Sequence, residues 1–399
     1  MGWKFQKSIQ KKWISNRLMM RKTKVLFRLR SLEMGGVVKV LIDILKNLPK
    51  EHLDITLMVN LHQGELRNEI PKEIKIIKIA KGKEDFNKNP LIYKFQLALR
   101  FLKLNLLNKF PALMKFYYKE SYDVEIAFGR SELEMVLNSP QKSSKKIAWV
   151  HWEFSHAPEL NRSEFLVNQL KEFEHVIFCS NNVRKQVKTL YGFELENSSV
   201  FHNVIHPDDL ENKMNQSIDF HLDDDIFTYI SVGRVKNGKG YPLLFDIHKE
   251  LMDEGIKHRI LIIGDGDKYE ELKQKAKAHQ LDESFILLGN QNNPFPYFKF
   301  ANAFVLPTQS EAYPLSVKEA LILGLPTLAT DVGGVSEIIS DREDGILMKY
   351  EKENIKNHIK ELVTNPSLYE HLKSNAKKAK DKFEIHEIYK QIENLLKNG

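Results

Sequence analysis

The sequence predicts an α/β protein built from two doubly wound, Rossmann-like domains, and three observations support this prediction. Short apolar runs alternate with helical stretches in two series, one from about residue 24 and one from about residue 226. Repeated strand–helix alternation implies parallel strands joined by crossover helices. The length of 399 residues fits two domains of about 150–200 residues each better than one core.

The expected elements follow in chain order. The first series predicts strands at Val25–Phe27, Ile55–Val59, Ile74–Ile77, Val124–Ala127, Ile147–Val150 and Val176–Phe178. The second predicts strands at Phe227–Val232, Ile260–Ile263, Phe285–Leu288, Ala303–Leu306 and Thr327–Thr330. The predicted organisation is a basic extension at 1–23, a first domain at 24–206, a linker at 207–225, a nucleotide-sugar-type domain at 226–380 and a helix at 381–399 that packs back on the first domain.

Composition and charge restrict the classes of protein. Hydrophobic residues make up 42% and charged residues 28%, as in a globular protein. Residues 1–206 carry a net charge of +14 and residues 207–399 a net charge of −7, so the two halves are expected to meet different partners. The single cysteine, Cys179, predicts a small buried hydrophobe and a reducing compartment. No apolar run spans a bilayer and no signal segment is evident, so we expect a cytoplasmic protein.

Two glutamates, Glu311 and Glu319, form the most informative pair of side chains. The first is expected in a loop at the carboxyl end of a strand, and the second in the first turns of the helix that ends at Gly324. Ligands of open α/β sheets bind at this edge. Two carboxylate acceptors there suit a ligand with many hydroxyl groups, such as a sugar or a ribose.

A glycine-rich segment, Gly233–Gly240, is the main candidate for phosphate binding. It follows a strand and precedes a helix with Pro242 near its first turn. Glycines allow close approach of the backbone, helix N–H groups favour an anion, and Arg234 and Lys239 can add charge-assisted bonds. The alternative is an ordinary surface turn with two solvated basic residues.

Two further glycine pairs have the same two interpretations. Gly35-Gly36 lies at the corresponding turn of the first domain, and Gly333-Gly334 follows the last predicted strand. Each pair either brings backbone amides to a diphosphate or forms a tight turn that needs positive φ. Asp265 and Asp267 could chelate a divalent cation, but we favour a cap of the next helix, because no further ligands converge on them.

Taken together, these segments resemble the retaining glycosyltransferases of family 4, the glycogen-synthase-like group, which have the GT-B fold. The resemblance is strongest from Phe227 to Leu347, where the pieces occur in the family's order. They are Ser231–Arg234 with Lys239-Gly240, Ile263–Gly266, the paired glutamates, Gly324–Thr327, Thr330–Gly334, Glu337–Ile339 and Asp344-Gly345. The resemblance implies two domains facing a central cleft, a nucleotide-sugar donor, and no metal or other cofactor.

The resemblance also implies roles for individual residues. Arg234 and Lys239 would bind the donor diphosphate, Glu311 the donor sugar and Glu319 the ribose. His151 would contact the sugar near the reaction centre, although Trp152 follows it where the family often has aspartate, and a structural histidine is the alternative. The other implied donor-binding positions are Gly35, Gly36, Gly233, Gly266, Ala312, Tyr313, Pro314 and Leu315.

The mechanism implied by the resemblance is a front-side displacement that retains the anomeric configuration. It transfers a hexose or N-acetylhexosamine, with UDP as the expected nucleotide, to a glycan or lipid-linked acceptor in cell-surface polysaccharide or lipopolysaccharide synthesis. The usual Asn-Gly-Val-Asp of the family appears here as Asn203–His206, which is a departure from the pattern. A nucleotide-sugar epimerase is the alternative enzyme, and a basic nucleic-acid-binding protein is a third possibility that the acidic second half disfavours.

The segment Leu91–Lys119 predicts a surface for an anionic membrane. It contains six basic and no acidic residues, with interleaved aromatic and aliphatic side chains. Phe5, Ile9 and Trp13 of the N-terminus share one helical face and resemble it in composition. The alternative for Leu91–Lys119 is a helix that packs on the core and exposes a basic side.

Overall fold

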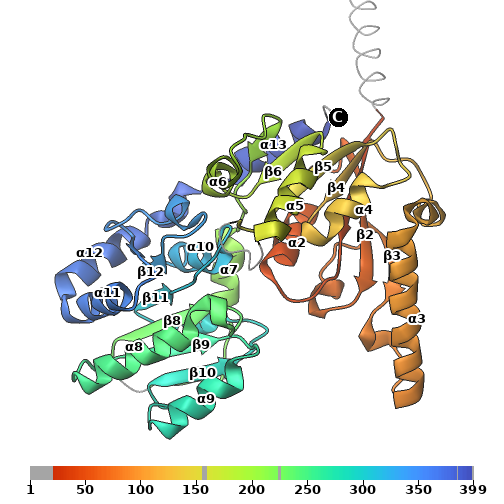
Figure 1. The fold of residues 1–399 in the computed structure, drawn as a ribbon. Helices are drawn as coiled ribbons and strands as arrows, with labels where there is room; N and C mark the ends of the chain where they lie inside the picture. The colour runs from red at the N-terminus through yellow and green to blue at the C-terminus, as the bar shows by residue number, and fades with distance from the viewer. Residues whose placement is uncertain (1–20, 155–159, 223–225, 384, 398–399) are drawn as a thin grey trace, which may run out of the picture. The chain divides into compact units, whose positions relative to one another are not determined.

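Two parallel β-sheets organise the chain in the computed structural model, which describes residues 21–154, 160–222, 226–383 and 385–397 (Figure 1). The first sheet has the order β3-β2-β1-β4-β5-β6-β7. Strand β1 pairs in parallel with β2 and β4, β2 with β3, and β4 with β5. The strands are β1 (Thr23–Leu29), β2 (Leu53–His62), β3 (Lys75–Lys81), β4 (Val124–Ala127), β5 (Lys145–Val150), β6 (His175–Phe178) and β7 (Ser198–Val200).

The second sheet has the order β10-β9-β8-β11-β12-β13, and all of its neighbouring strands are parallel. Its strands are β8 (Thr228–Val232), β9 (Arg259–Ile263), β10 (Phe285–Gly289), β11 (Ala303–Leu306), β12 (Thr327–Thr330) and β13 (Gly345–Met348). These two sheets confirm the predicted doubly wound pair. Only the short strands β7 and β13 were absent from the prediction.

Helices connect the strands and cover the sheets. In the first half they are α2 (Gly36–Asn47), α3 (Pro90–Lys109), α4 (Leu133–Leu137), α5 (Leu160–Lys171) and α6 (Asn181–Tyr191). In the second half they are α7 (Pro207–Met214), α8 (Tyr241–Asp253), α9 (Tyr269–Ala278), α10 (Leu315–Ile322), α11 (Lys352–Thr364), α12 (Pro366–Ala376) and α13 (Ile385–Lys397).

The second sheet is buried on both faces, which explains its continuous apolar strands. Side chains alternate between the two faces of a strand. On β9, Ile260 and Ile262 therefore join one core with Leu244 and Phe245 of α8. Leu261 joins the opposite core with Val317 of α10. A parallel sheet covered on both sides favours apolar residues on both faces, and in β9 all five residues are buried, the four after Arg259 being isoleucine or leucine.

The chain divides into two compact units. Of the described residues, the first unit comprises 21–150, 168–177 and 387–397, and the second comprises the remainder. The segment 178–206, which the sequence placed with the first domain, groups with the second unit, because the start of α6 is hydrogen-bonded to Glu337. Within the predicted linker, helix α7 begins at Pro207, a residue type suited to the first helical position.

Helix α13 belongs to the first unit although it ends the described chain. The hydroxyl of Tyr389 on α13 donates a hydrogen bond to Asp43 of α2. Burial, followed by the charge of Asp43, raises the pKa of Tyr389 well above its usual value, so the phenol stays protonated as a donor. Cys179 is fully buried among apolar side chains, which confirms the structural interpretation of the lone cysteine.

Helix α3 presents most of its apolar side chains to solvent. Its N-cap is Asn89, whose side chain accepts from the N–H groups of Leu91 and Ile92, and Pro90 occupies the first turn. Leu107 is its one buried residue. The interpretation of α3 as a core-packing helix is therefore wrong for most of its length. No helix in the described part of the chain has the length and apolarity needed to cross a membrane.

A pair of buried histidines, His248 on α8 and His258 before β9, lies in the second unit. His258 Nδ1 lies 2.9 Å from the carbonyl oxygen of Ile256, which can only accept, so this nitrogen carries the proton. His258 Nε2 then accepts from His248 Nδ1 at 2.9 Å. Both rings are neutral in this arrangement. Burial, and the neighbouring His258, lower the pKa of His248 to about 3.

We predict that this pair makes the protein less stable in mild acid. Both pKa values are lowered from the ordinary 6.5, so the unfolded chain binds protons that the folded chain does not. The free energy of unfolding should therefore be highest above pH 6.5 and fall below it, by about 1.4 kcal/mol per pH unit for each such histidine. Urea unfolding at pH 7.5, 6.0 and 5.0 measures this slope.

The variant His248→Phe should have a smaller slope, because it removes one of the titrating groups. The exposed His221 offers a matched control, and His221→Asn should leave the slope unchanged. An unchanged slope in His248→Phe would contradict the assignment.

Candidate active site

The candidate site lies at the carboxyl edge of the second sheet, where the strand order reverses. Strands β8 and β11 are neighbours, but β8 continues the chain toward β9 on one side and β11 toward β12 on the other. Loops leaving two such strands run in opposite directions and leave space for a ligand between them. These loops, at 233–240 after β8 and 307–314 after β11, contain seven of the predicted donor-binding residues: Gly233, Arg234, Lys239, Glu311, Ala312, Tyr313 and Pro314.

Lys239 and Glu311 are brought into direct contact by these two loops. The ammonium of Lys239 forms an ion pair with the carboxylate of Glu311, and the side chains are 20% and 15% exposed. Lys239 ends the short 3-10 helix Asn237–Lys239. The sequence predicted both residues for the site, but it did not predict that they contact each other.

Three basic side chains crowd this position. Lys236, absent from the predicted site, precedes Lys239, and Arg234 is exposed at the start of the same loop. Burial lowers the pKa of Lys236, and so do the nearby charges of Lys239 and Arg234. Mutual repulsion of this kind favours the binding of an anion.

Packing between the loops accounts for Gly240. This residue has φ of 76°, and an added Cβ would lie 1.7 Å from the carbonyl oxygen of Pro307. The hydroxyl of Thr308 donates to the Gly238 carbonyl at 3.1 Å, and the N–H of Gln309 donates to the same oxygen at 3.0 Å. Gly240 thus allows the two loops to approach each other, whereas a Cβ added at Gly238 would meet no neighbouring atom.

Tyr313 contributes its side chain to the core and leaves its backbone near the site. The ring is 5% exposed and stacks on His202, with centroids 5.0 Å apart and planes inclined by 11°. Helix α10 begins two residues later, after Pro314, with no side-chain cap among the described residues. Its first N–H groups are therefore suited to an anionic ligand.

Glu319 lies on the second turn of α10 and is largely buried, with 7% of its surface exposed. Its neighbour Lys318 is also buried and donates to the carbonyl oxygen of Asn203 at 2.8 Å. This bond ties α10 to the segment after β7. No feature of the sequence predicted this bond, because a lysine in an amphipathic helix usually faces water.

The structure corrects the interpretation of Asp265. Helix α9 begins at Tyr269, and its N-cap position is Lys268, with no side-chain cap bond among the described residues. The Asp265 carboxylate instead accepts from the N–H of Gly266 at 2.7 Å. Asp265 therefore shapes the turn after β9 and does not cap the helix.

His151 and the Gly35-Gly36 pair lie in other parts of the chain. His151 follows β5 and is half-buried, and burial lowers its pKa to about 3, so the imidazole is neutral at pH 7. Gly35 has φ of 174°, which is extended backbone, and Gly36 starts α2. The tight-turn interpretation with positive φ is thus wrong for Gly35, and the N-terminus of α2 has no side-chain cap among the described residues.

The loop after β12 supports the backbone of Glu311 and Ala312. Gly333 has φ of 53°, and an added Cβ would lie 1.5 Å from the carbonyl oxygen of Glu311. The N–H of Gly334 donates to the carbonyl of Ala312 at 3.0 Å. For Gly333 the tight-turn interpretation is therefore confirmed, and the turn serves to pack one loop on another.

A carboxylate that the sequence did not single out as a site residue follows this loop. Glu337 accepts from the N–H groups of Asn181 and Asn182 at 2.9 and 2.7 Å. His202 Nε2 also lies 2.9 Å from its carboxylate. Asn181 and Glu337 are 156 positions apart in the sequence. Only the folded chain brings them together.

Comparison with known proteins relates the second half of the chain to a known class. Residues 212–379 match the model of the family described as Glycosyl transferases group 1. A protein of Haemophilus influenzae, described as an uncharacterized glycosyltransferase, is 27% identical over 260 residues, which cover 63% of this chain and 69% of that protein. These matches support a glycosyltransferase.

Two further similar proteins have names that state what they transfer or bind. An N-acetylgalactosamine-N,N'-diacetylbacillosaminyl-diphospho-undecaprenol 4-alpha-N-acetylgalactosaminyltransferase of Campylobacter jejuni is 30% identical over 192 residues, covering 47% of this chain and 50% of that protein. The crystal structure of a TarM variant of S. aureus, in complex with Fondaparinux, alpha-GlcNAc-glycerol and UDP, is similar to this chain with a TM-score of 0.72. Identity to TarM is 14%, with 94% of this chain and 100% of that chain covered. This likeness shows the fold, which is GT-B.

We predict that Gly333→Ala destabilises the protein and weakens ligand binding at the site. The positive φ and the 1.5 Å approach to the Glu311 carbonyl both oppose a side chain. The expected loss is about 2–4 kcal/mol of unfolding free energy. Urea unfolding measures it.

Gly255→Ala is the matched control, because Gly255 has φ of 79° but open surroundings. It should lose only about 1 kcal/mol. Equal losses in the two variants would show that backbone conformation alone, and not the loop contact, explains Gly333.

Proposed function

We propose that this protein is a retaining glycosyltransferase that moves a hexose or N-acetylhexosamine from a UDP-linked donor to a glycan or lipid-linked acceptor. The observation that carries this proposal is the Lys239–Glu311 contact at the switch point of the second sheet. The UDP in the TarM complex and the diphospho-undecaprenol in the name of the Campylobacter jejuni relative support the donor and acceptor classes. The setting would be cell-surface polysaccharide or lipopolysaccharide synthesis.

In this proposal the diphosphate is held by positive charge and backbone amides. Arg234 and Lys239 bind its oxygens, with Gly233 and Gly266 in the adjoining turns. The N–H groups at the start of α10, near Tyr313, Pro314 and Leu315, supply further donors. Negative charge that develops on the leaving group is stabilised by the same groups.

The sugar and the nucleoside are held by separate carboxylates. Glu311 accepts from hydroxyl groups of the sugar, beside Ala312, and Glu319 accepts from the ribose. A donor diphosphate would draw Lys239 away from Glu311, because the diphosphate as a whole carries more negative charge than one carboxylate and offers more acceptor oxygens. Glu311 is then free to accept from the sugar.

The proposed reaction breaks the bond from the anomeric carbon to the diphosphate and forms a bond to the acceptor oxygen on the same face. The acceptor proton passes to the departing phosphate oxygen. Neutral His151 offers a hydrogen bond to the donor sugar, and Gly35 and Gly36 at the uncapped start of α2 offer backbone amides. No metal ion is required in this scheme.

We predict that Lys239→Gln lowers transfer by about a hundredfold or more, because one charge-assisted bond to the leaving group is lost. Release of UDP from a panel of UDP-sugars, with and without glycan acceptors and in the presence of EDTA, measures the activity. The anomeric configuration of the product, followed by NMR, tests retention.

Lys268→Gln is the control, because Lys268 is a basic side chain of the neighbouring turn that pairs with Glu271. It should keep near wild-type activity. Transfer by Lys239→Gln at the wild-type rate would overturn the site, and isomerisation of the sugar without transfer would indicate an epimerase.

We also propose that α3 lies on an anionic membrane surface, on the cytoplasmic side, where a lipid-linked acceptor would be presented. Five exposed apolar residues of α3 are spaced by three or four positions, so they form a stripe along one face of the helix. The stripe consists of Leu91, Phe95, Leu99, Leu102 and Leu106. No acidic residue lies between Leu91 and Lys119, so the surroundings favour anionic headgroups.

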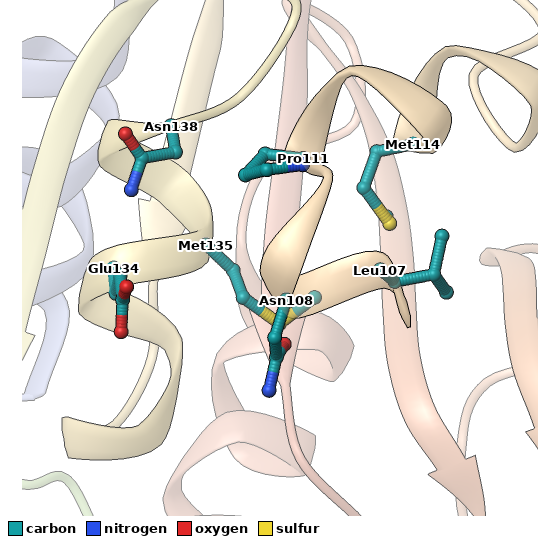
Figure 2. A pocket seen from close by; sticks show the side chains of 7 residues that line it. All are labelled: Leu107, Asn108, Pro111, Met114, Glu134, Met135 and Asn138. Atoms are coloured by element: carbon teal, nitrogen blue, oxygen red, sulfur yellow. The ribbon is translucent and has the colours of Figure 1, made fainter. Parts of the chain in front are cut away.

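The C-terminal end of α3 packs into the core of the first unit, whereas the stripe lies exposed. Leu107 and Met114 are buried where α3 meets the 3-10 helix Pro111–Phe116. A small pocket lies between this junction and α4, lined by Leu107, Asn108, Pro111, Met114, Glu134, Met135 and Asn138 (Figure 2). The predicted second membrane contact, at Trp3–Trp13, lies outside the described residues.

We predict that Phe95→Asp combined with Leu102→Asp strongly reduces sedimentation with vesicles that contain phosphatidylglycerol. The change places two negative charges in the middle of the stripe, where both burial and attraction to the headgroups are lost. The measurement is the fraction of protein that sediments at low salt.

Leu190→Asp is the matched control, since Leu190 is an exposed leucine on α6 and is 45% exposed. It should sediment like the wild type. A wild-type protein that does not sediment at low salt would contradict the membrane proposal and leave the donor site unaffected.

A further inference from the structure

The carboxylate of Glu337 lies at the N-terminus of α6 and is almost enclosed by donors. It accepts from the backbone N–H groups of Asn181 and Asn182 and from the Asn181 side chain at 3.1 Å, with His202 Nε2 at 2.9 Å. The side chain is 15% exposed. Each of these contacts satisfies a carboxylate lone pair, and the helix dipole adds to the stabilisation of negative charge.

These contacts keep Glu337 ionised. Burial acts to raise its pKa, but the bonds from His202, Asn181 and Asn182 outweigh burial, and the pKa lies below its ordinary value. An ionised carboxylate in this position holds two otherwise separate elements together, the first turn of α6 and the segment after β7.

Two chains of contacts lead from Glu337 to the segment Glu311–Leu315. In the first, the side chain of Asn182 donates through Nδ2 to the Gly333 carbonyl at 2.9 Å. The backbone N–H of the next residue, Gly334, donates to the Ala312 carbonyl. The second runs through His202, whose ring stacks on Tyr313. If Glu337 served only to cap a helix, contacts with α6 alone would be sufficient. Both chains of contacts end on the loop that carries Glu311.

We propose that Glu337 is a positioning residue for the sugar part of the donor. By fixing the loop after β12 and His202 together, it holds Glu311 and Ala312 in the geometry that accepts the sugar hydroxyl groups. This inference rests on the proposed donor site, and it concerns a residue that does not itself touch the donor.

The test compares two ligands on the full chain. Dissociation constants are measured for UDP, which differs from the donor by the missing sugar, and for the UDP-sugar that the wild type binds most tightly among UDP-glucose and UDP-N-acetylglucosamine. In Glu337→Gln we expect the UDP-sugar constant to rise by about tenfold and the UDP constant by less than about twofold, because the charge-assisted bonds that fix Glu311 and Ala312 beside the sugar are weakened. The Michaelis constant for the donor should rise with it, while that for the acceptor stays unchanged.

A second variant keeps the test valid if Glu337→Gln folds poorly. His202→Phe retains a ring to stack on Tyr313 but removes the bond to Glu337, and it should produce a smaller loss in the same direction. Glu343→Gln is the matched control. Glu343 also pairs with a histidine, His371, and with Asn375, but on the exposed surface.

The outcomes separate the two proposals. Wild-type protein that binds neither UDP nor a UDP-sugar would overturn the proposed function together with this inference. Wild-type binding with equal weakening of both ligands in Glu337→Gln, or with no weakening, would overturn the positioning role alone. Loss of thermal stability without a change in the ratio of the two constants would show a merely structural cap.

Discussion

The close packing of one loop on the backbone of another is the constraint on which the rest of the second unit depends. The turn at Gly333 lies so near the Glu311 carbonyl that no side chain fits between them. Gly240 meets the Pro307 carbonyl in the same way on the other side of β11. The segment after β11 is therefore held between two neighbouring loops. Because packed interiors do not deform continuously, a small displacement of either loop would be transmitted to Glu311.

Electrostatics at the site depends on the same packing. Lys239 and Glu311 face each other in partial burial, where an ion pair gains little net free energy because desolvation offsets attraction. Such a pair is a weak contributor to stability but a suitable device for binding. A ligand that carries both a diphosphate and hydroxyl groups can satisfy the lysine and the carboxylate at once. The pair thus keeps each side chain oriented, and such a ligand would replace their mutual contact with two better ones.

The sequence was sufficient for the sheets and for the loops that leave them, because parallel strands buried on both faces have unmistakable apolar runs, as at Ile260–Ile263. It was also sufficient to place Lys239 and Glu311 at one edge, since that follows from strand–loop–helix order. It did not reveal Glu337, His202 or Lys318. Their roles depend on partners more than a hundred positions away, and a lone glutamate or lysine is most often solvated. Asp265 was misassigned because an aspartate before a helix can bond to its own turn as readily as to the helix.

The exposed stripe of α3 costs the protein the free energy that burial of its apolar side chains would provide. A helix that is apolar on its outer face gains nothing from that face in water, while burial of each large side chain is worth about 1.5–3 kcal/mol. The five residues of the stripe are 46–80% exposed, so they hold a free energy of roughly 5–9 kcal/mol that is realised only when another surface covers them. The flanking lysines, including Lys94, exclude a basic partner and add about 1 kcal/mol each near anionic lipid. Apolar burial and basic charge together satisfy the need for two signals in stable membrane attachment, and each alone would be marginal. The lipid-linked acceptor of the proposed function would give such attachment a purpose, because it would confine protein and acceptor to one surface and raise their encounter frequency.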